Sequence, residues 1–137
     1  MWLAVDEKLN ERFPELKALV VSVHGVKVER ENEQLEEFKK QLLGKLKEKY
    51  TLEQLKDLEI FRAYRDFYWR IGIDPTKTRP AGEALLRRVL AGKPFPKINT
   101  LVDAYNLASV QSGIAIGAFD RSRLRGDLLL RSAKAGE

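Results

Sequence analysis

Apolar residues recur at helical spacing through the middle of the chain, and glycine and proline residues divide this pattern into separate helices. The predicted helices span residues 32–50, 51–72, 80–92 and 99–112. Thr51 and Gln54 have the spacing of a capping box, and Pro80 suits a first helical turn. Asn99 or Thr100 is expected to cap the last helix, which ends at Ser112-Gly113. A chain with this pattern has a substantial helical part.

The segments on either side of these helices have the composition of β-strands. Strands are predicted at residues 2–5 (WLAV), 16–29, 114–119 (IAIGAF) and 127–133 (DLLLRSA). The order of strands, helices and strands predicts an α+β fold. Nothing in the sequence covers the edge of the last strand, so we expect either self-association or a further segment to cover it.

The composition excludes several classes of protein. The length of 137 residues suits one domain, and no apolar run approaches the length of a membrane span. The chain has no cysteine and one histidine, which excludes disulfides and makes a structural zinc site implausible. We expect a cytoplasmic protein without a cofactor or a metal.

The charge is distributed unevenly along the chain. Residues 1–70 hold 14 basic and 14 acidic residues, whereas residues 71–137 hold 11 basic and 6 acidic residues. The whole net charge of +5 therefore lies in the second half. This asymmetry favours a polyanionic partner such as nucleic acid.

Familiar catalytic motifs are absent. The sequence has no P-loop, no G-x-G-x-x-G and no G-x-S-x-G, and no cysteine can act as a nucleophile. His24 either has a catalytic role or is a strand-end histidine with a satisfied hydrogen bond, and the lack of a nearby carboxylate favours the second reading. A self-sufficient acid–base enzyme is poorly supported.

An aromatic cluster lies in the second predicted helix. Its members are Phe61, Tyr64, Phe67, Tyr68 and Trp69. Such side chains can stack on nucleic-acid bases, but their helical spacing favours packing in the core.

The loop Lys77-Thr78-Arg79 precedes the third helix. Free N–H groups and the positive end of the helix dipole favour an anion there, and Arg79 can hold a phosphate in a bidentate manner. The alternative is an ordinary helix entry with exposed charges.

The fourth helix has polar residues in one stripe. Asn99, Asp103 and Asn106 are spaced four and three residues apart on a helix that is otherwise mostly apolar. Asn99 and Asp103 are explained if they cap the helix, but Asn106 then remains, and it either fixes a neighbouring loop or faces a polar ligand.

These residues also carry a resemblance. The stretch VDAYNLASVQSGIAIGAFDRSRLRG (102–126) resembles, without a gap, the pattern V-D-x-T-N-Y followed by G-Q-P-L-H-A-F-D-L-D of the bacterial phenylalanyl-tRNA synthetase β subunit. DLLLRSAKAGE looks like its continuation, G-x-(I/L)-x-V-R-x-A-x-x-G-E, and residues 74–103 are similar to free-standing relatives. The family is that of the B3/B4 domain, a tRNA-binding and editing domain.

The resemblance implies a fold of helices packed on a mostly antiparallel sheet. Family members continue past Glu137, so residues 1–137 are expected to be a single B3/B4-like domain without the C-terminal part, or the N-terminal fragment of a longer domain. In the synthetase this domain hydrolyses tyrosine wrongly attached to phenylalanine tRNA.

The resemblance also implies site residues. The positions that match the synthetase pattern are Asp103, Asn106, Gly113, Ala118, Phe119 and Asp120. Asn106 falls on an asparagine that lines the editing pocket, whereas Tyr105 replaces a threonine and Gly117 replaces the pocket histidine. The expected substrate-binding residues are Asp103, Tyr105, Asn106 and Gly117.

The expected function is hydrolysis of the ester of a mischarged aminoacyl-tRNA, with water as the nucleophile and tRNA as the partner. The expected RNA contacts are Lys77, Arg79, Arg121, Arg123 and Arg125. The alternatives are a non-catalytic RNA-binding or protein-interaction module with the same fold, and a small-molecule sensor that uses the same pocket.

Overall fold

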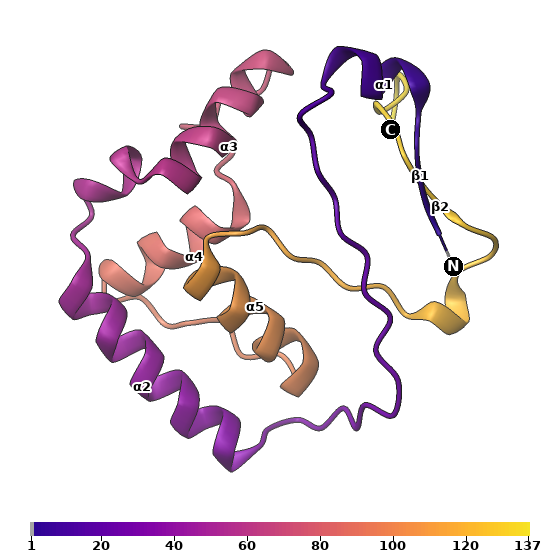
Figure 1. Cartoon of the computed structure of the whole chain (residues 1–137). Helices are drawn as coiled ribbons and strands as arrows, with labels where there is room; N and C mark the ends of the chain where they lie inside the picture. Colours follow the sequence, from indigo (N-terminus) through magenta and orange to yellow (C-terminus); the bar gives the residue numbers. More distant parts are fainter. Residues whose placement is uncertain (1) are drawn as a thin grey trace. The chain divides into compact units, whose positions relative to one another are not determined.

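The computed structural model describes residues 2–137 and divides into two compact units, which are described separately. The helical unit comprises Lys27–Ala118, and the terminal unit joins residues 2–26 to Phe119–Glu137. Figure 1 shows the chain from indigo at its start to yellow at its end. In the part that the structure describes, no helix is long and apolar enough to cross a membrane.

Four α-helices and a 3₁₀ helix form the helical unit. They are α2 (Glu33–Lys49), η1 (Gln54–Asp57), α3 (Glu59–Arg70), α4 (Ala81–Leu90) and α5 (Thr100–Ser112). α2, α4 and α5 pack against one another, and η1 and α3 follow α2 along the chain (Figure 1). The buried core is made by Leu42, Leu46, Leu55, Phe61, Leu86, Val89, Leu107 and Val110. All of these residues belong to the helical unit.

The predicted helix boundaries are confirmed where a local cap defines them. The side-chain oxygen of Asn32 accepts a hydrogen bond from the Leu35 amide at 3.0 Å, and that of Asn99 accepts one from the Val102 amide at 3.0 Å. Gly113 ends α5 with a φ of 78°, in the left-handed region that glycine adopts without strain.

The prediction of one continuous second helix is wrong. The Thr51 amide donates to Gln54 as predicted, at 2.9 Å, but the chain is extended at Leu58, which separates η1 from α3. Leu55 and Phe61 are both almost completely buried. Leu55 and Phe61 are six positions apart, and in an unbroken helix this spacing would direct their side chains to different faces. The break at Leu58 therefore allows both side chains to reach the same core.

The terminal unit contains a small sheet. β1 (Leu3–Val5) and β2 (Leu128–Leu130) are parallel, with Leu3 opposite Leu128. The short helix α1 (Glu7–Arg12) was not expected from the sequence; Asp6 caps it by accepting from the Leu9 amide at 3.2 Å. The 3₁₀ helix η2 (Arg121–Arg123) lies in the basic segment between the predicted strands at 114–119 and 127–133.

The predicted sheet is therefore wrong in extent and direction. The chain is mostly helical, and the sheet in residues 2–137 has two parallel strands instead of a mostly antiparallel arrangement. The predicted strands at 2–5 and 127–133 are each confirmed over three residues.

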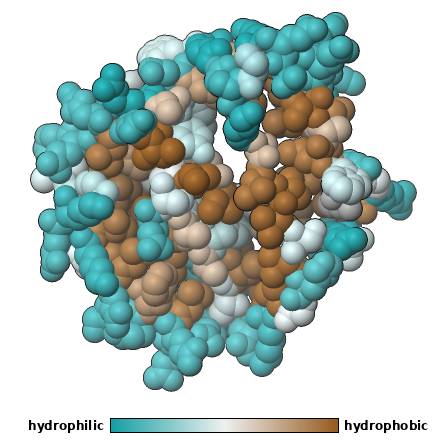
Figure 2. All heavy atoms as spheres, viewed as in Figure 1, coloured by the Kyte–Doolittle hydropathy of each residue, from teal (hydrophilic) through white to brown (hydrophobic). Residues whose placement is uncertain are grey.

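The predicted strands at 16–29 and 114–119 are not present. Both segments lack a ladder partner among the described residues, although the first is rich in valine. A β-branched sequence stabilises a strand through cross-strand packing, so this composition forms no strand where no partner lies beside it. Leu19, Val21 and Val23 are correspondingly exposed. Apolar side chains reach the surface over much of the face in Figure 2.

Candidate functional site

The polar stripe of α5 divides into two structural residues and one residue without a partner. Besides the cap made by Asn99, the buried Asp103 accepts a hydrogen bond from the Ile98 amide through Oδ1 at 2.9 Å. Asn106 is half-buried, and its side chain makes no hydrogen bond with any described residue. Capping thus accounts for Asn99 and for one oxygen of Asp103, whose Oδ2 is buried without a hydrogen-bond partner among the described residues. The Asn106 amide remains available to a ligand.

The other expected pocket residues lie in different surroundings. Tyr105 is half-buried on α5, whereas Gly117 lies in exposed extended chain, with open space where a Cβ would be. The Ala115 amide donates to the Tyr64 hydroxyl at 2.9 Å and the Ser109 hydroxyl donates to the Ile114 carbonyl at 2.6 Å. These two bonds attach the beginning of the extended segment to α3 and α5.

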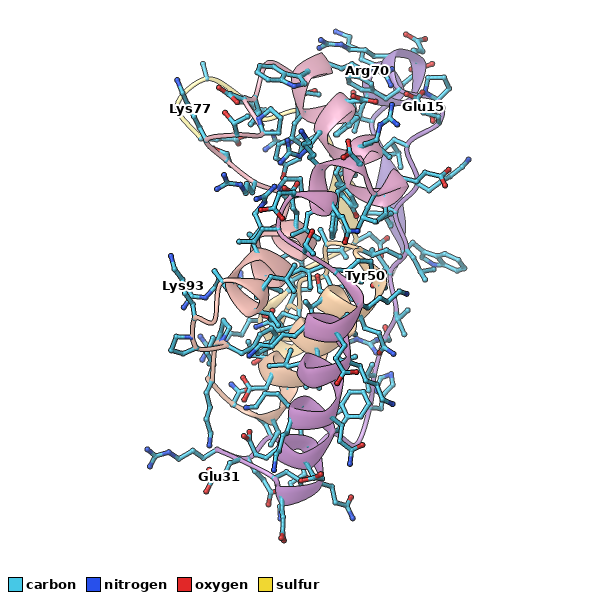
Figure 3. All side chains as sticks on the ribbon, turned by 90° about the vertical axis from the view of Figure 1, so that its left-hand side faces the viewer. Glu15, Glu31, Tyr50, Arg70, Lys77 and Lys93 are labelled. Carbon is cyan, nitrogen blue, oxygen red and sulfur yellow. The ribbon has the colours of Figure 1, made fainter. Side chains whose placement is uncertain are left out.

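A different feature of the helical unit concentrates charge. An open depression of about 450 Å³, here called the basic depression, is lined by Leu52, Lys77, Arg79, Ala84, Arg87, Arg88, Ala91 and Lys93. Five of the eight lining residues are cationic and none is acidic. Figure 3 shows Lys77 and Lys93 on the same side of the helical unit, both pointing outward. Asn106 does not line this depression.

The basic depression brings together predicted and unpredicted residues. Lys77 and Arg79 were expected to bind phosphate, and α4 and the turn after it add Arg87, Arg88 and Lys93. Arg87 and Lys93 are six residues apart, about 1.7 helical turns, so a continued helix would direct their side chains to different faces. The turn at Gly92 ends α4 instead, and the Lys93 amide donates to the Arg88 carbonyl at 2.9 Å, which keeps Lys93 beside the end of α4. In the sequence, the adjacent arginines Arg87 and Arg88 are the feature that could have indicated the depression, but by themselves they indicate only an exposed face of a helix.

Two turns hold the edges of the basic depression. Asp74 accepts from the Thr76 hydroxyl at 2.6 Å and from its amide at 2.8 Å, and both bonds lower the pKa of Asp74. The Thr78 amide donates to the Asp74 carbonyl at 2.9 Å and closes the loop that carries Lys77. After α4, Arg88 donates through Nε and Nη2 to the Pro94 carbonyl, at 3.2 and 3.0 Å.

A buried carboxylate lies behind the basic depression. Glu83 of α4 is fully buried, and it accepts from Arg65 of α3 at 2.9 Å (Nε) and 2.5 Å (Nη2). Arg87 Nε donates to the same carboxylate at 2.7 Å. Burial raises the pKa of Glu83, but the hydrogen bonds from Arg65 and Arg87 outweigh this effect and the net pKa is lowered. This ionised cluster was not predicted from the sequence.

Arg121, Arg123 and Arg125 belong to the terminal unit and are all exposed. Asp120 caps η2 by accepting from the Ser122 amide at 3.0 Å, and it lies 3.6 Å from Arg123 Nε. Arg121 Nη1 lies 3.5 Å from Nε2 of His24, at the limit of a hydrogen bond. His24 is exposed and has no carboxylate partner within the described residues. His24 is therefore not the strand-end histidine that was predicted, because residues 16–29 form no strand.

Residues 2–137 contain no group of three or more His, Asp or Glu side chains placed to hold a metal ion. What the geometry offers is hydrogen-bonding groups and cations. The protein is therefore of a mostly helical class, and its helical unit carries a cationic surface depression.

The comparison with protein families identifies the chain more closely. It belongs to the B3/4 domain family, whose model matches residues 63–137. The match includes α4, α5 and β2, and all five cations of the basic depression lie in α4 or within four residues of its ends. Comparisons with curated proteins and with solved structures gave no match. That residues 1–137 form a single domain of this kind stays a prediction.

Proposed function

We propose that this B3/4 domain binds tRNA and that the basic depression contacts the phosphates of the RNA backbone. The observation that carries the proposal is the set of five cations around one depression with no acidic side chain among its lining residues. Like charges that converge in this way repel one another, and an anionic ligand relieves that repulsion.

The cations differ in how far the protein itself neutralises them. Arg87 is bound to Glu83, and Arg88 is bound to a main-chain carbonyl. Lys77, Arg79 and Lys93 are exposed and have no ion pair with any described residue. Their positive charge is therefore available for phosphate, and release of counterions from the RNA would drive the association.

The size of the basic depression supports a phosphodiester ligand. A volume of about 450 Å³ lies within the range of small-molecule sites, roughly 300–1,000 Å³. The depression is open to solvent, as suits a continuous backbone that enters and leaves. The second set of expected RNA contacts is Arg121, Arg123 and Arg125, whose exposure on the terminal unit agrees with that role.

The direct test compares two matched double variants in a tRNA-binding titration. Lys77→Ala/Lys93→Ala removes two lysines of the basic depression, whereas Lys45→Ala/Lys47→Ala removes two exposed lysines of α2. We expect the first pair to weaken tRNA binding at least tenfold more than the second. Equal losses would show that the basic depression has no special role.

A second candidate function is hydrolysis of the ester of a mischarged aminoacyl-tRNA. Its support is the Asn106 amide, which remains without a partner on a helix where Asn99 and Asp103 have structural roles. In this proposal Asn106 orients the substrate, Tyr105 and Gly117 are further residues expected to contact it, and water attacks the ester carbonyl. Asp103 supports the helix through Ile98 and does not itself need to contact the substrate.

The non-catalytic alternative is supported by Gly117. This residue offers no side chain where the resemblance implies a histidine, and it lies in exposed chain. A deacylation assay on a panel of mischarged tRNAs separates the two functions. Release of an amino acid that Asn106→Ala abolishes supports hydrolysis. Retained tRNA binding without release of any amino acid supports the binding module.

A further inference from the structure

We propose that Trp69 is a base-stacking residue, so that the ligand of the helical unit is an unpaired RNA segment with its phosphates at the basic depression and a base on the indole. The inference rests on the proposed RNA binding and specifies which form of RNA is bound. One side chain of the aromatic cluster, Trp69, is unexpectedly exposed.

Four of the five aromatic side chains in this cluster are covered. Phe61 is buried in the core, which confirms core packing for this residue, and Tyr64, Phe67 and Tyr68 are half-buried. Trp69 differs, because 57% of its surface is exposed. Ile71 and Ile73, which follow it, are 36% and 37% exposed. The end of α3 therefore presents an indole and two aliphatic side chains to solvent.

Trp69 lies in the last turn of α3, from which the chain continues directly into the loop that leads to α4. Trp69 is one helical turn after Arg65 and so lies on the same side of α3. Arg65 is bound to Glu83 in the first turns of α4, and Arg79 precedes Glu83 by four residues. Arg65 thus faces α4, and Trp69 lies one turn closer to the end of α3, where the chain enters the loop that carries Lys77 and Arg79.

Main-chain hydrogen bonds keep this connection compact. The Ile73 amide donates to the Tyr68 carbonyl at 2.9 Å, and the Gly72 amide donates to the Trp69 carbonyl at 3.1 Å. The loop then closes between Asp74 and Thr78. Arg70, the neighbour of Trp69, and Lys77 lie at the same end of the helical unit in Figure 3.

Recognition of single-stranded nucleic acid uses two components, an exposed aromatic ring and nearby cations. Cationic side chains follow the backbone and an aromatic ring stacks on a base. An unpaired base can leave its neighbours and cover the indole, whereas a base within a duplex is already stacked on both faces. The charged neighbours favour RNA over an apolar protein segment as the occupant of this surface.

The experiment uses the fact that the chain has two tryptophans, Trp2 and Trp69. In a Trp2→Phe background, Trp69 is the only indole, and its fluorescence is followed while a single-stranded oligoadenylate or an RNA duplex of equal length is added. We expect the single strand to quench the fluorescence and the duplex to leave it nearly unchanged. We also expect Trp69→Ala to weaken single-strand binding by roughly 10- to 100-fold, with partial recovery in Trp69→Phe.

The outcomes separate this inference from the proposed function. Stacking on Trp69 is refuted, while RNA binding stands, if Trp69→Ala binds the single strand as tightly as the parent protein. The same holds if the substitution lowers the affinities for the single strand and for the duplex by the same factor. If neither RNA form binds the parent protein, both proposals are refuted. Thermal melting by circular dichroism checks that Trp69→Ala is folded, as its exposed position predicts.

Discussion

Gly82 of α4 and Gly113, the C-cap of α5, bring the main chains of their two helices into direct contact. A Cβ atom on Gly82 would lie 2.6 Å from the Gly113 carbonyl oxygen and 2.9 Å from its carbonyl carbon. Main-chain atoms cannot move aside as a flexible side chain can. The close approach of α4 and α5 therefore depends on the absence of a side chain at position 82.

We predict that Gly82→Ala lowers the free energy of unfolding by about 1–3 kcal/mol, because the added methyl group forces the two helices apart. Gly44→Ala in α2 is the matched control, since a Cβ there meets no atom within 4 Å. This control should be stabilised by up to about 1 kcal/mol through helix propensity. Urea denaturation of both variants gives the comparison, and equal stability of the two would contradict the packing argument.

The bond between Glu83 and Arg65 leads to a second prediction. Glu83→Gln leaves the guanidinium groups of Arg65 and Arg87 without their counter-charge, so we expect a loss on the order of 3 kcal/mol in unfolding free energy. Glu31→Gln, which breaks the exposed pair with Lys97, should change stability little. Thermal unfolding of both variants tests this, and a Glu83→Gln variant as stable as Glu31→Gln would show that the buried pair is unimportant.

The state of Glu83 also predicts a pH dependence. Its pKa in the folded protein lies below its ordinary value of 4.5. Between these two values the unfolded chain binds more protons, so the stabilisation is complete above pH 4.5 and is lost as the pH falls through the folded pKa. Carboxyl ¹³C NMR shifts of Glu83 measure this pKa directly. A value above 4.5 would mean that burial outweighs the two arginines.

The two asparagines of the α5 stripe are predicted to behave differently. Asn99→Ala removes the cap on Val102 and should cost about 1 kcal/mol of stability. Asn106→Ala removes no hydrogen bond to a described residue, so its melting temperature should stay close to that of the parent. Calorimetry of the two variants checks this difference. A large destabilisation by Asn106→Ala would assign that residue to the scaffold.

The features that could be predicted from the sequence are those that depend on a few neighbouring residues. Asn32, Asn99 and Gly113 end or begin their helices as predicted, because a cap is made within three or four residues. Lys77 and Arg79 were singled out because they precede a helix start, and both line the basic depression, although their binding of phosphate stays a prediction. The caps before Asn106 left two alternatives for it, and the structure shows no hydrogen bond from its side chain to a loop among the described residues.

The rest depended on contacts between distant residues. Glu83 has an arginine four residues ahead, Arg87, but its burial also depends on Arg65, which lies 18 residues away in the chain and binds the same carboxylate. The segment 16–29 has strand composition, but β-propensity describes packing on a neighbouring strand, and the structure provides none. Trp69 was grouped with the core aromatics because helical spacing does not show which turns of a helix are covered by other elements, and the last turn of α3 leaves Trp69 exposed.

The most direct measurement of the central claim is the salt dependence of tRNA affinity. If the basic depression contacts backbone phosphates, the logarithm of the association constant falls linearly with the logarithm of salt concentration. Lys77→Ala/Lys93→Ala should then reduce this slope by roughly 2, about one for each lost phosphate contact, while Lys45→Ala/Lys47→Ala leaves it unchanged. An unchanged slope in the first variant, with the protein folded, would contradict the assignment of this depression as the RNA-binding site.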